Sequence, residues 1–281
     1  MKTRIVIDST ADLPEALRGR FTVLPLTVNF GDESFQDGVT ITHREFYERL
    51  IESDVLPTTS QVPPQAFHDA FQEAVDAGEE VVALTISSKL SGTWQSAMIA
   101  AEDFPGKVHV VDSRTATIAT GILAEYALSL AETGMPAAEV AARLEEEREN
   151  VRLIAMLDTL EYLKKGGRIS AATAFAGGLL SIKPVISLPG GEIEILGKAR
   201  GSKQGNNLLV REIGKAGGVD FEKPLLLGYT GLNDDLLQKY IQDSGSLWAG
   251  NVSELRTTLI GSVIGTHAGP GAIAVAFFKK A

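Results

Sequence analysis

Hydroxyl side chains gather directly after a short apolar segment in the first half of the chain. Val81–Ile86 is rich in β-branched residues, which is typical of a parallel strand buried on both faces. Ser91, Gly92 and Thr93 follow where the next helix would begin. Because the first turn of a helix offers unpaired N–H groups and a positive dipole end, it binds anions readily. The segment therefore predicts an anion site, and the alternative is a hydroxyl that only caps the helix.

The same pattern follows two other predicted strands. Arg4–Ile7 and Lys107–Val111 both run into an aspartate and a serine. The carboxyl ends of parallel strands meet at one edge of a sheet, where open α/β proteins bind ligands. We therefore expect a shared polar crevice, unless the carboxylates serve only to cap helices or order turns. The side chains expected there are Asp8, Ser9, Ser87, Ser88, Ser91, Thr93, Asp112 and Ser113.

Two more segments carry groups that could meet an anion. Thr58–Gln61 offers Thr59 and Ser60 between two prolines, and we expect an irregular loop there. Among four histidines, His267 stands apart because it lies in the glycine-rich segment 265–271, which we also interpret as a loop. A histidine in such a place can donate to an anion, act as a base or hold the turn. The residues alone leave these three roles open.

Several classes of enzyme lack their usual sequence marks. Ser91, His267 and Asp112 could form a hydrolase triad, but no G-x-S-x-G surrounds Ser91. Neither a phosphate-binding G-x-x-x-x-G-K-[ST] nor a dinucleotide-binding G-x-G-x-x-G after the first strand is present. The metal-binding spacing H-E-x-x-H is also missing, so we expect no metal site. Arg168 and Arg200 follow glycine-containing segments and could grip a carboxylate, a phosphate or an acidic partner, or remain solvated charges.

Composition indicates an ordinary soluble protein. The chain has 281 residues, of which 44% are hydrophobic and 22% charged, and this length suits two domains. Its net charge is -10 and the sequence shows no basic stripe, so we expect no nucleic-acid partner. No apolar run approaches the roughly 20 residues that cross a bilayer, and Asp8 interrupts the N-terminal apolar run too early for a signal peptide. We expect a cytoplasmic protein.

Strand and helix patterns alternate through the first half of the chain. This alternation predicts an α/β domain over residues 1–150, with a mostly parallel sheet and helices on both faces. A small β excursion is expected at about residues 21–40, where proline and glycine break the alternation. Residues 151–281 are predicted to form a second α/β (α+β) domain that includes a hairpin turning at 189–191.

The motifs together resemble the DegV family, the fatty-acid-binding proteins that serve bacterial fatty acid kinases. Small departures are Trp94, where the family often has tyrosine, and Val62, where proline is commoner. The resemblance covers nearly the whole chain, and its most specific parts are 90–93, 165–169 and 267–271. The matching segments are Ile7–Leu13, Thr59–Gln61, Ser87–Ala97, Val111–Ser113, Asp158–Ser170, Ile182–Pro184 and Gly265–Gly271.

The resemblance implies that one long-chain fatty acid binds between the domains. Its carboxylate would be held by the positions matching Thr59, Ser91 and His267, and its acyl chain would enter an apolar tunnel walled in part by Ala171–Leu180. Other residues of the matching motifs would support the site. These supporting residues are Asp8, Ser60, Gly92, Thr93, Asp112, Ser113 and Gly269.

The resemblance also implies that the chain itself is not an enzyme. A separate ATP-dependent kinase subunit would phosphorylate the carboxylate to an acyl phosphate for phospholipid synthesis, and Arg168 and Arg200 match positions suited to contact it. No cofactor or metal is expected, and contact with a membrane surface would be transient. Two alternatives remain: an acyl hydrolase using Ser91 and His267, and a carrier of another amphiphilic carboxylate.

Overall fold

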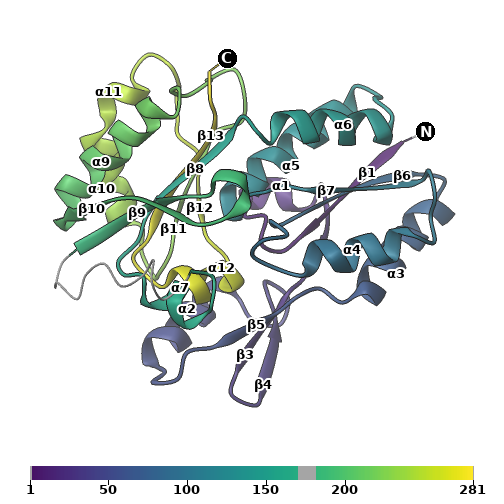
Figure 1. Cartoon of the computed structure of the whole chain (residues 1–281), viewed down its shortest axis with the longest axis horizontal. Helices are drawn as coiled ribbons and strands as arrows, with labels where there is room; N and C mark the ends of the chain where they lie inside the picture. The colour runs from purple at the N-terminus through teal and green to yellow at the C-terminus, as the bar shows by residue number, and fades with distance from the viewer. Residues whose placement is uncertain (1, 170–181, 281) are drawn as a thin grey trace.

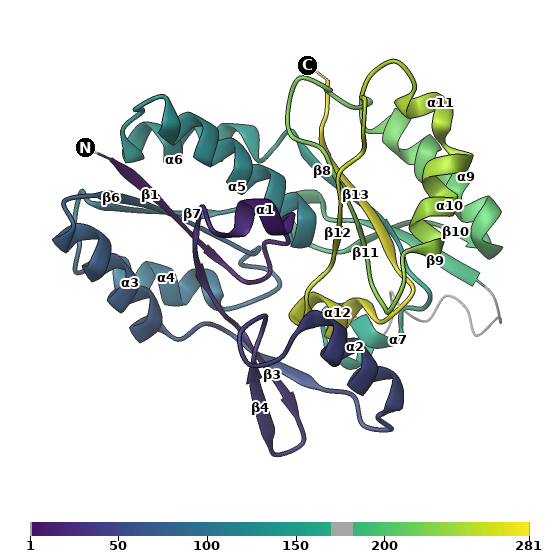
Figure 2. The same cartoon turned by 180° about the vertical axis from the view of Figure 1, so that it is seen from behind.

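The structure is a computed structural model that describes residues 2–169 and 182–280, and Figures 1 and 2 show its layers from opposite sides. Its first sheet is parallel throughout, with strand order β2-β1-β6-β7. Buried β-branched and aliphatic residues form these strands, as their apolar runs predict. They are β1 (Thr3–Asp8), β2 (Thr22–Leu24), β6 (Glu80–Thr85) and β7 (Val108–Asp112).

Helices cover both faces of the parallel sheet because successive strand residues point to opposite sides. Val81 and Ala83 pack in the core under α3 and α4, whereas Val82 and Leu84 pack in the core under α5 and α6. The covering helices are α3 (Pro64–Asp76), α4 (Thr93–Ala101), α5 (Thr117–Glu132) and α6 (Ala137–Glu147). The predicted α/β class is confirmed.

The second sheet has six strands in the order β10-β9-β8-β13-β11-β12, and its pairs are antiparallel except β11 with β12. One face packs on α5, which therefore lies between the two sheets, and the other packs on the three outer helices α9, α10 and α11. The strands are β8 (Val151–Met156), β9 (Ile182–Ser187), β10 (Glu194–Arg200), β11 (Leu226–Tyr229), β12 (Thr257–Leu259) and β13 (Ile273–Phe278). The outer helices are α9 (Gly201–Lys215), α10 (Asp235–Asp243) and α11 (Gly245–Trp248).

A smaller layer joins the two sheets at one end of the molecule (Figure 1). It contains a three-stranded antiparallel sheet, order β4-β3-β5, and helix α12, which contacts α2, α7, β3 and β5. Its elements are β3 (Thr27–Phe30), β4 (Glu33–Gln36), α2 (His43–Glu52), β5 (Thr58–Ser60), α7 (Glu161–Lys165) and α12 (Ser262–Ala268). The short helix α1 (Glu15–Arg18) follows β1.

The segment at residues 21–40, expected as a small β excursion, contains β2, which pairs in parallel with β1, and the antiparallel pair β3 and β4. Two local predictions are wrong. Thr58–Ser60 is strand β5 rather than an irregular loop, since β3 offers it a free edge. His267 lies in the last turn of α12 rather than on a loop.

The hairpin around Pro189–Gly191 is confirmed, with β9 and β10 paired antiparallel across it. Every strand of the six-stranded sheet lies between residues 151 and 278, which agrees with a division near residue 150, and that boundary stays a prediction. The proposed tunnel wall at Ala171–Leu180 lies outside the described residues. Within the described ranges, no helix has the length and apolar character required to span a bilayer.

Candidate ligand-binding site

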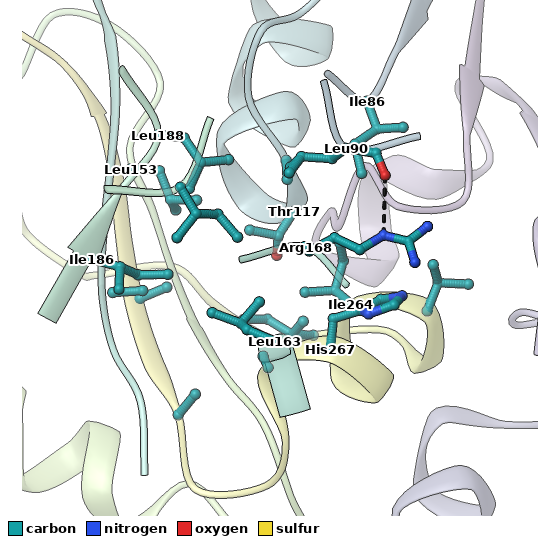
Figure 3. Close-up of a pocket in the computed structure, with 18 of the residues that line it drawn as sticks. Ile86, Leu90, Thr117, Leu153, Leu163, Arg168, Ile186, Leu188, Ile264 and His267 are labelled. Atoms are coloured by element: carbon teal, nitrogen blue, oxygen red, sulfur yellow. Dashed lines mark hydrogen bonds between the residues drawn. The ribbon is translucent and has the colours of Figure 1, made fainter. Parts of the chain in front are cut away.

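An apolar cavity lies where the parallel sheet, α12 and the second sheet meet (Figure 3). Both halves of the chain build its walls, because strands and helices from each side present aliphatic side chains to it. Most of the lining is aliphatic, and Figure 3 shows the side chains directed into one space. The labelled aliphatic residues are Ile86, Leu90, Leu153, Leu163, Ile186, Leu188 and Ile264.

Polar groups gather at one end of this cavity. Thr59 of β5, Ser91 of the β6–α4 turn and His267 of α12 all line it. The Thr59 Oγ1 and His267 Nε2 atoms share a hydrogen bond of 2.9 Å. Ser91 Oγ shares a hydrogen bond of 2.9 Å with Thr93 Oγ1 and accepts one of 3.2 Å from the Thr93 N–H. The three residues predicted to hold a carboxylate are therefore brought to one cavity from three separate parts of the chain.

Burial makes His267 a neutral group at ordinary pH. Desolvation, with a smaller contribution from the nearby Arg168 charge, lowers the pKa of His267 to about 4. Its Nδ1 atom has no hydrogen-bond partner among the described residues and faces Gly166, where a Cβ atom would overlap it. Only Nε2 of the ring is therefore available, and because it carries one hydrogen or one lone pair it bonds either Thr59 or a ligand in the cavity.

Arg168 lies on the wall beside His267 (Figure 3). Its Nε donates to the Leu90 carbonyl at 3.2 Å and its Nη1 donates to the Gly166 carbonyl at 2.6 Å. Desolvation lowers the pKa of this half-buried guanidinium. The structure thus adds a cation to the wall of the cavity, where it could grip a carboxylate, one of the roles that the sequence left open for Arg168.

Two carboxylates hold the turn that carries Leu90 and Ser91. The neighbours of β6 in the sheet are β1 and β7, and each ends in an aspartate. Asp8 Oδ2 accepts from the Ile86 N–H at 2.7 Å, and Asp112 accepts from the Ser88 N–H and hydroxyl at 3.1 and 2.5 Å. Burial raises the pKa of Asp8, whereas the hydrogen bonds that its carboxylate accepts act to lower this pKa. Both aspartates support the turn and neither lines the cavity.

The other predicted supporting residues also lie off the cavity lining. Ser113 is buried and donates to the Thr115 carbonyl, Thr93 is buried beneath Ser91, and Ser60 is exposed on β5. Arg200 is exposed before α9.

Steric contacts explain why two positions at the site are glycine. A Cβ atom on Gly92 would overlap the Gln61 carboxamide, so the β6–α4 turn can approach β5 closely. Gly269 ends α12 with φ of 73°, a conformation that favours glycine, and a Cβ atom there would overlap the Tyr162 ring. Both glycines therefore shape the site without facing its interior.

Sequence reasoning missed two polar residues of the lining, Thr117 and Thr230. Thr230 directly follows β11, so the rule that polar residues follow strand ends could have found it. Thr117 begins α5 with φ of 54°, an unusual value for a β-branched residue that sequence patterns do not signal. Its strain and its place on the wall indicate a constrained position.

This arrangement is poorly suited to nucleophilic catalysis. A serine nucleophile needs a hydrogen bond to its base, and the base needs a third group to orient it. In the described part of the chain, Ser91 bonds Thr93 while His267 bonds Thr59, and no bond joins Ser91 to His267. With Nδ1 unpaired, no carboxylate orients the ring. The geometry instead suits binding of a polar head by neutral donors above an apolar cavity.

Comparison with known proteins identifies the family. The model of the DegV family, described as an uncharacterised protein family, matches residues 2–280. The chain belongs to the DegV family. A DegV domain-containing protein of Caldanaerobacter subterraneus, TTE1491, is 35% identical and the match covers 99% of both chains.

Solved structures of this family share the whole fold. A Thermus thermophilus DegV family protein described by its fatty acid binding is 36% identical with a TM-score of 0.87, covering 99% of this chain and 100% of that one. A stearic acid-binding protein from Eubacterium ventriosum is 28% identical with a TM-score of 0.87, covering 99% and 98%. A DegV family protein from Eubacterium eligens loaded with heptadecanoic acid is 26% identical with a TM-score of 0.85, covering 99% and 100%.

Proposed function

We propose that this protein binds one long-chain fatty acid, with the carboxylate at Thr59, Ser91 and His267 and the acyl chain in the apolar cavity. The observation that carries the proposal is the convergence of these three polar side chains at one end of an otherwise mostly aliphatic cavity. The similar stearic acid-binding protein and the DegV family protein loaded with heptadecanoic acid support the ligand class.

The chemistry of the polar end fits a carboxylate. A buried carboxylate needs compensating donors, because transfer from water without them is costly. Two hydroxyls and a neutral imidazole can supply hydrogen bonds, and the Arg168 charge beside His267 favours an anion there. Each methylene of the acyl chain that leaves water for the aliphatic cavity stabilises the complex by about 0.8 kcal/mol.

The second part of the proposal is that the protein is not itself a catalyst. A separate ATP-dependent kinase subunit would transfer the γ-phosphoryl group of ATP to a carboxylate oxygen, which yields an acyl phosphate and ADP. Arg168 and Arg200 would contact that subunit, as their motif positions suggest. The exposed position of Arg200 and the place of Arg168 beside the polar end of the cavity are compatible with this role.

Lipid extraction tests the ligand directly. The purified protein, incubated with oleate or palmitate and separated from free lipid, is denatured and its extract is analysed by mass spectrometry. We expect one fatty acid per chain. Recovery of another amphiphilic carboxylate from the untreated protein, with no retention of added fatty acid, would contradict the proposal and favour the alternative carrier.

Single substitutions test the site. We expect Ser91→Ala and His267→Ala each to weaken fatty-acid retention by about 1–3 kcal/mol, the cost of an unpaired buried polar group. Ser113→Ala is the matched control, because it removes a buried hydroxyl that lies off the cavity. Unchanged retention in both site variants would remove these residues from the site. Ester hydrolysis that disappears in Ser91→Ala would instead establish the hydrolase.

The partner reaction is tested by adding a purified fatty acid kinase subunit and ATP to the loaded protein. Acyl phosphate trapped with hydroxylamine is expected only when both proteins are present. Arg200→Ala should lower this yield while fatty-acid retention stays unchanged. Equal yields from wild type and Arg200→Ala would refute the contact assigned to this residue.

A further inference from the structure

Two buried carboxylates meet the first backbone amides of α12, at the opposite end of this helix from His267. Asp12 Oδ1 accepts from the Gly261 N–H at 2.7 Å, and Asp37 Oδ1 accepts from the Ser262 N–H at 3.0 Å. Asp12 is 4% exposed and Asp37 is 1% exposed. A carboxylate that accepts from the first amides of a helix is favoured by the helix dipole, so both bonds hold the start of α12 in place.

Asp12 also holds the opposite wall of the cavity. Its Oδ2 atom accepts from the Thr117 hydroxyl at 2.6 Å. Thr117 is the first residue of α5, lines the cavity and has the unusual φ of 54°. One carboxylate thus joins the start of α5 to the start of α12, and it supplies a bond that favours the strained conformation of Thr117.

Asp37 ties the small antiparallel sheet to the same point. Its Oδ2 atom accepts from the Ser9 hydroxyl at 2.9 Å, and Ser9 Oγ accepts from the Leu26 N–H at 3.1 Å. The His43 Nε2 atom lies 3.5 Å from Asp37 Oδ1. Since β5 of this sheet carries Thr59, Asp37 connects both partners of the Thr59–His267 hydrogen bond to the turn after β1.

The body of α12 has little room to tilt. The Tyr47 hydroxyl donates to the Ile260 carbonyl at 2.9 Å, and a Cβ atom on Gly265 would lie 2.5 Å from that hydroxyl oxygen. At its far end, the Thr230 hydroxyl donates to the Gly269 carbonyl at 2.7 Å. Figure 2 shows α2 beside α12. Because α12 has only seven residues, about two turns, it moves as one body, and a shift at its first turn moves its last turn as well.

We propose that Asp12 and Asp37 are positioning residues for the carboxylate site: their hydrogen bonds to the first amides of α12 place His267 Nε2 beside Thr59. Neither carboxylate lines the cavity, so both act through the helix. The consequence for ligand binding rests on the proposed function, whereas the placement of His267 is a property of the ligand-free protein.

The test compares alanine and asparagine at the two positions. Asp12→Ala and Asp37→Ala remove the acceptor of an α12 amide, while Asp12→Asn and Asp37→Asn keep a carbonyl oxygen that can replace it. The matched control is Asn206→Ala, which breaks a buried bond from α9 to Asp243 of α10, and neither helix lines the cavity. The ¹⁵N shifts of the His267 ring in ligand-free protein, hydrogen exchange at Gly261 and Ser262, and fatty-acid affinity are measured.

We expect the alanine variants to shift the His267 ring signals, to speed exchange at the two amides and to weaken fatty-acid affinity at least 10-fold. The asparagine variants should restore the signals and stay within about threefold of wild type, and Asn206→Ala should lose stability without either effect. Wild-type ring signals in a folded alanine variant would overturn the proposal. If an alanine variant does not fold, a shifted His267 signal in the corresponding folded asparagine variant overturns it. Failure of the wild type to bind fatty acid would refute the proposed function alone, because the ring signals need no ligand.

Discussion

Gly166→Ala should disable the proposed carboxylate site without unfolding the protein. Gly166 follows α7 with φ of -73°, which alanine adopts without strain. Its new Cβ atom would overlap His267 Nδ1 and lie 2.8 Å from Cε1. Ordinary carbon contacts need about 3.5 Å, so the ring must move by roughly 1 Å. A shift of that size breaks the 2.9 Å bond from Nε2 to Thr59.

The expected loss follows from that displaced ring. Misplacing one buried hydrogen-bonding group costs about 1–3 kcal/mol, which corresponds to a fatty-acid affinity about 5- to 150-fold lower. The melting temperature should change little, because alanine restricts the unfolded chain more than glycine does. Competition against a fluorescent fatty acid on delipidated protein measures the affinity.

A matched control separates the ring displacement from a general effect of alanine. Gly214 lies inside α9, and among the described residues no atom outside its chain neighbours and its own helix backbone lies within 4 Å of the position that a Cβ atom would take there. Gly214→Ala should therefore bind like wild type and gain up to about 1 kcal/mol of stability. Equal affinities for Gly166→Ala and Gly214→Ala, with the His267 ring shifted in its NMR spectrum, would refute the role of His267 in holding the carboxylate.

Three further outcomes are expected. Burial raises the pKa of Asp12 to about 7, so between pH 4 and 7 the folded state holds a proton that the unfolded state has released. The free energy of unfolding should therefore fall by up to a few kcal/mol as the pH rises from 4 to 7. Asp12→Asn should flatten this pH dependence in urea titrations. Gly269→Ala, which forces alanine to φ of 73° and into the Tyr162 ring, should lower the melting temperature and loosen His267. Ile186→Phe adds volume to the cavity wall and should shift retention toward shorter acyl chains in competition between laurate and stearate.

The sequence predicts the main elements well because their signals are local. Val81–Ile86 and Ala272–Phe278 are short apolar runs, and each coincides within a residue or two with a buried strand. The helix at His43–Glu52 was missed, although Thr42 and Glu45 form the capping box that marks its start. That signal was present and local, so it could have been found.

The remaining errors concern elements that only tertiary contacts stabilise. Thr58–Ser60 has three residues and becomes a strand because β3 pairs with it. The segment containing His267 looks like a loop because glycines interrupt it, yet Gly265 lies inside α12 where the absence of a side chain admits Tyr47. Neither contact can be read from the segment itself, since each joins residues far apart in the sequence.

The expectation that ligands bind beyond the carboxyl ends of parallel strands led to the edge of the sheet where the cavity lies, but it did not predict the roles of the individual residues. Asp8 and Asp112 reach this edge, where their oxygens accept from the turn after β6 rather than facing the cavity. Ser91 faces the cavity because that turn is held from both sides. Carboxylates that already accept hydrogen bonds from the protein are therefore supports, and the Ser91 hydroxyl on the turn between them lines the cavity.

The choice of donors bears on how a bound carboxylate could react. Arg168 donates from Nε and Nη1 to two backbone carbonyls, so two of the five N–H groups of its guanidinium are already used within the protein. Its charge still favours an anion, while Thr59 and His267 supply single neutral hydrogen bonds. Such a site holds the carboxylate in place and leaves lone pairs free. Phosphoryl transfer requires a free oxygen as the nucleophile, so under the proposed function a bidentate cation at this position, as in Thr59→Arg, should slow formation of the acyl phosphate trapped with hydroxylamine.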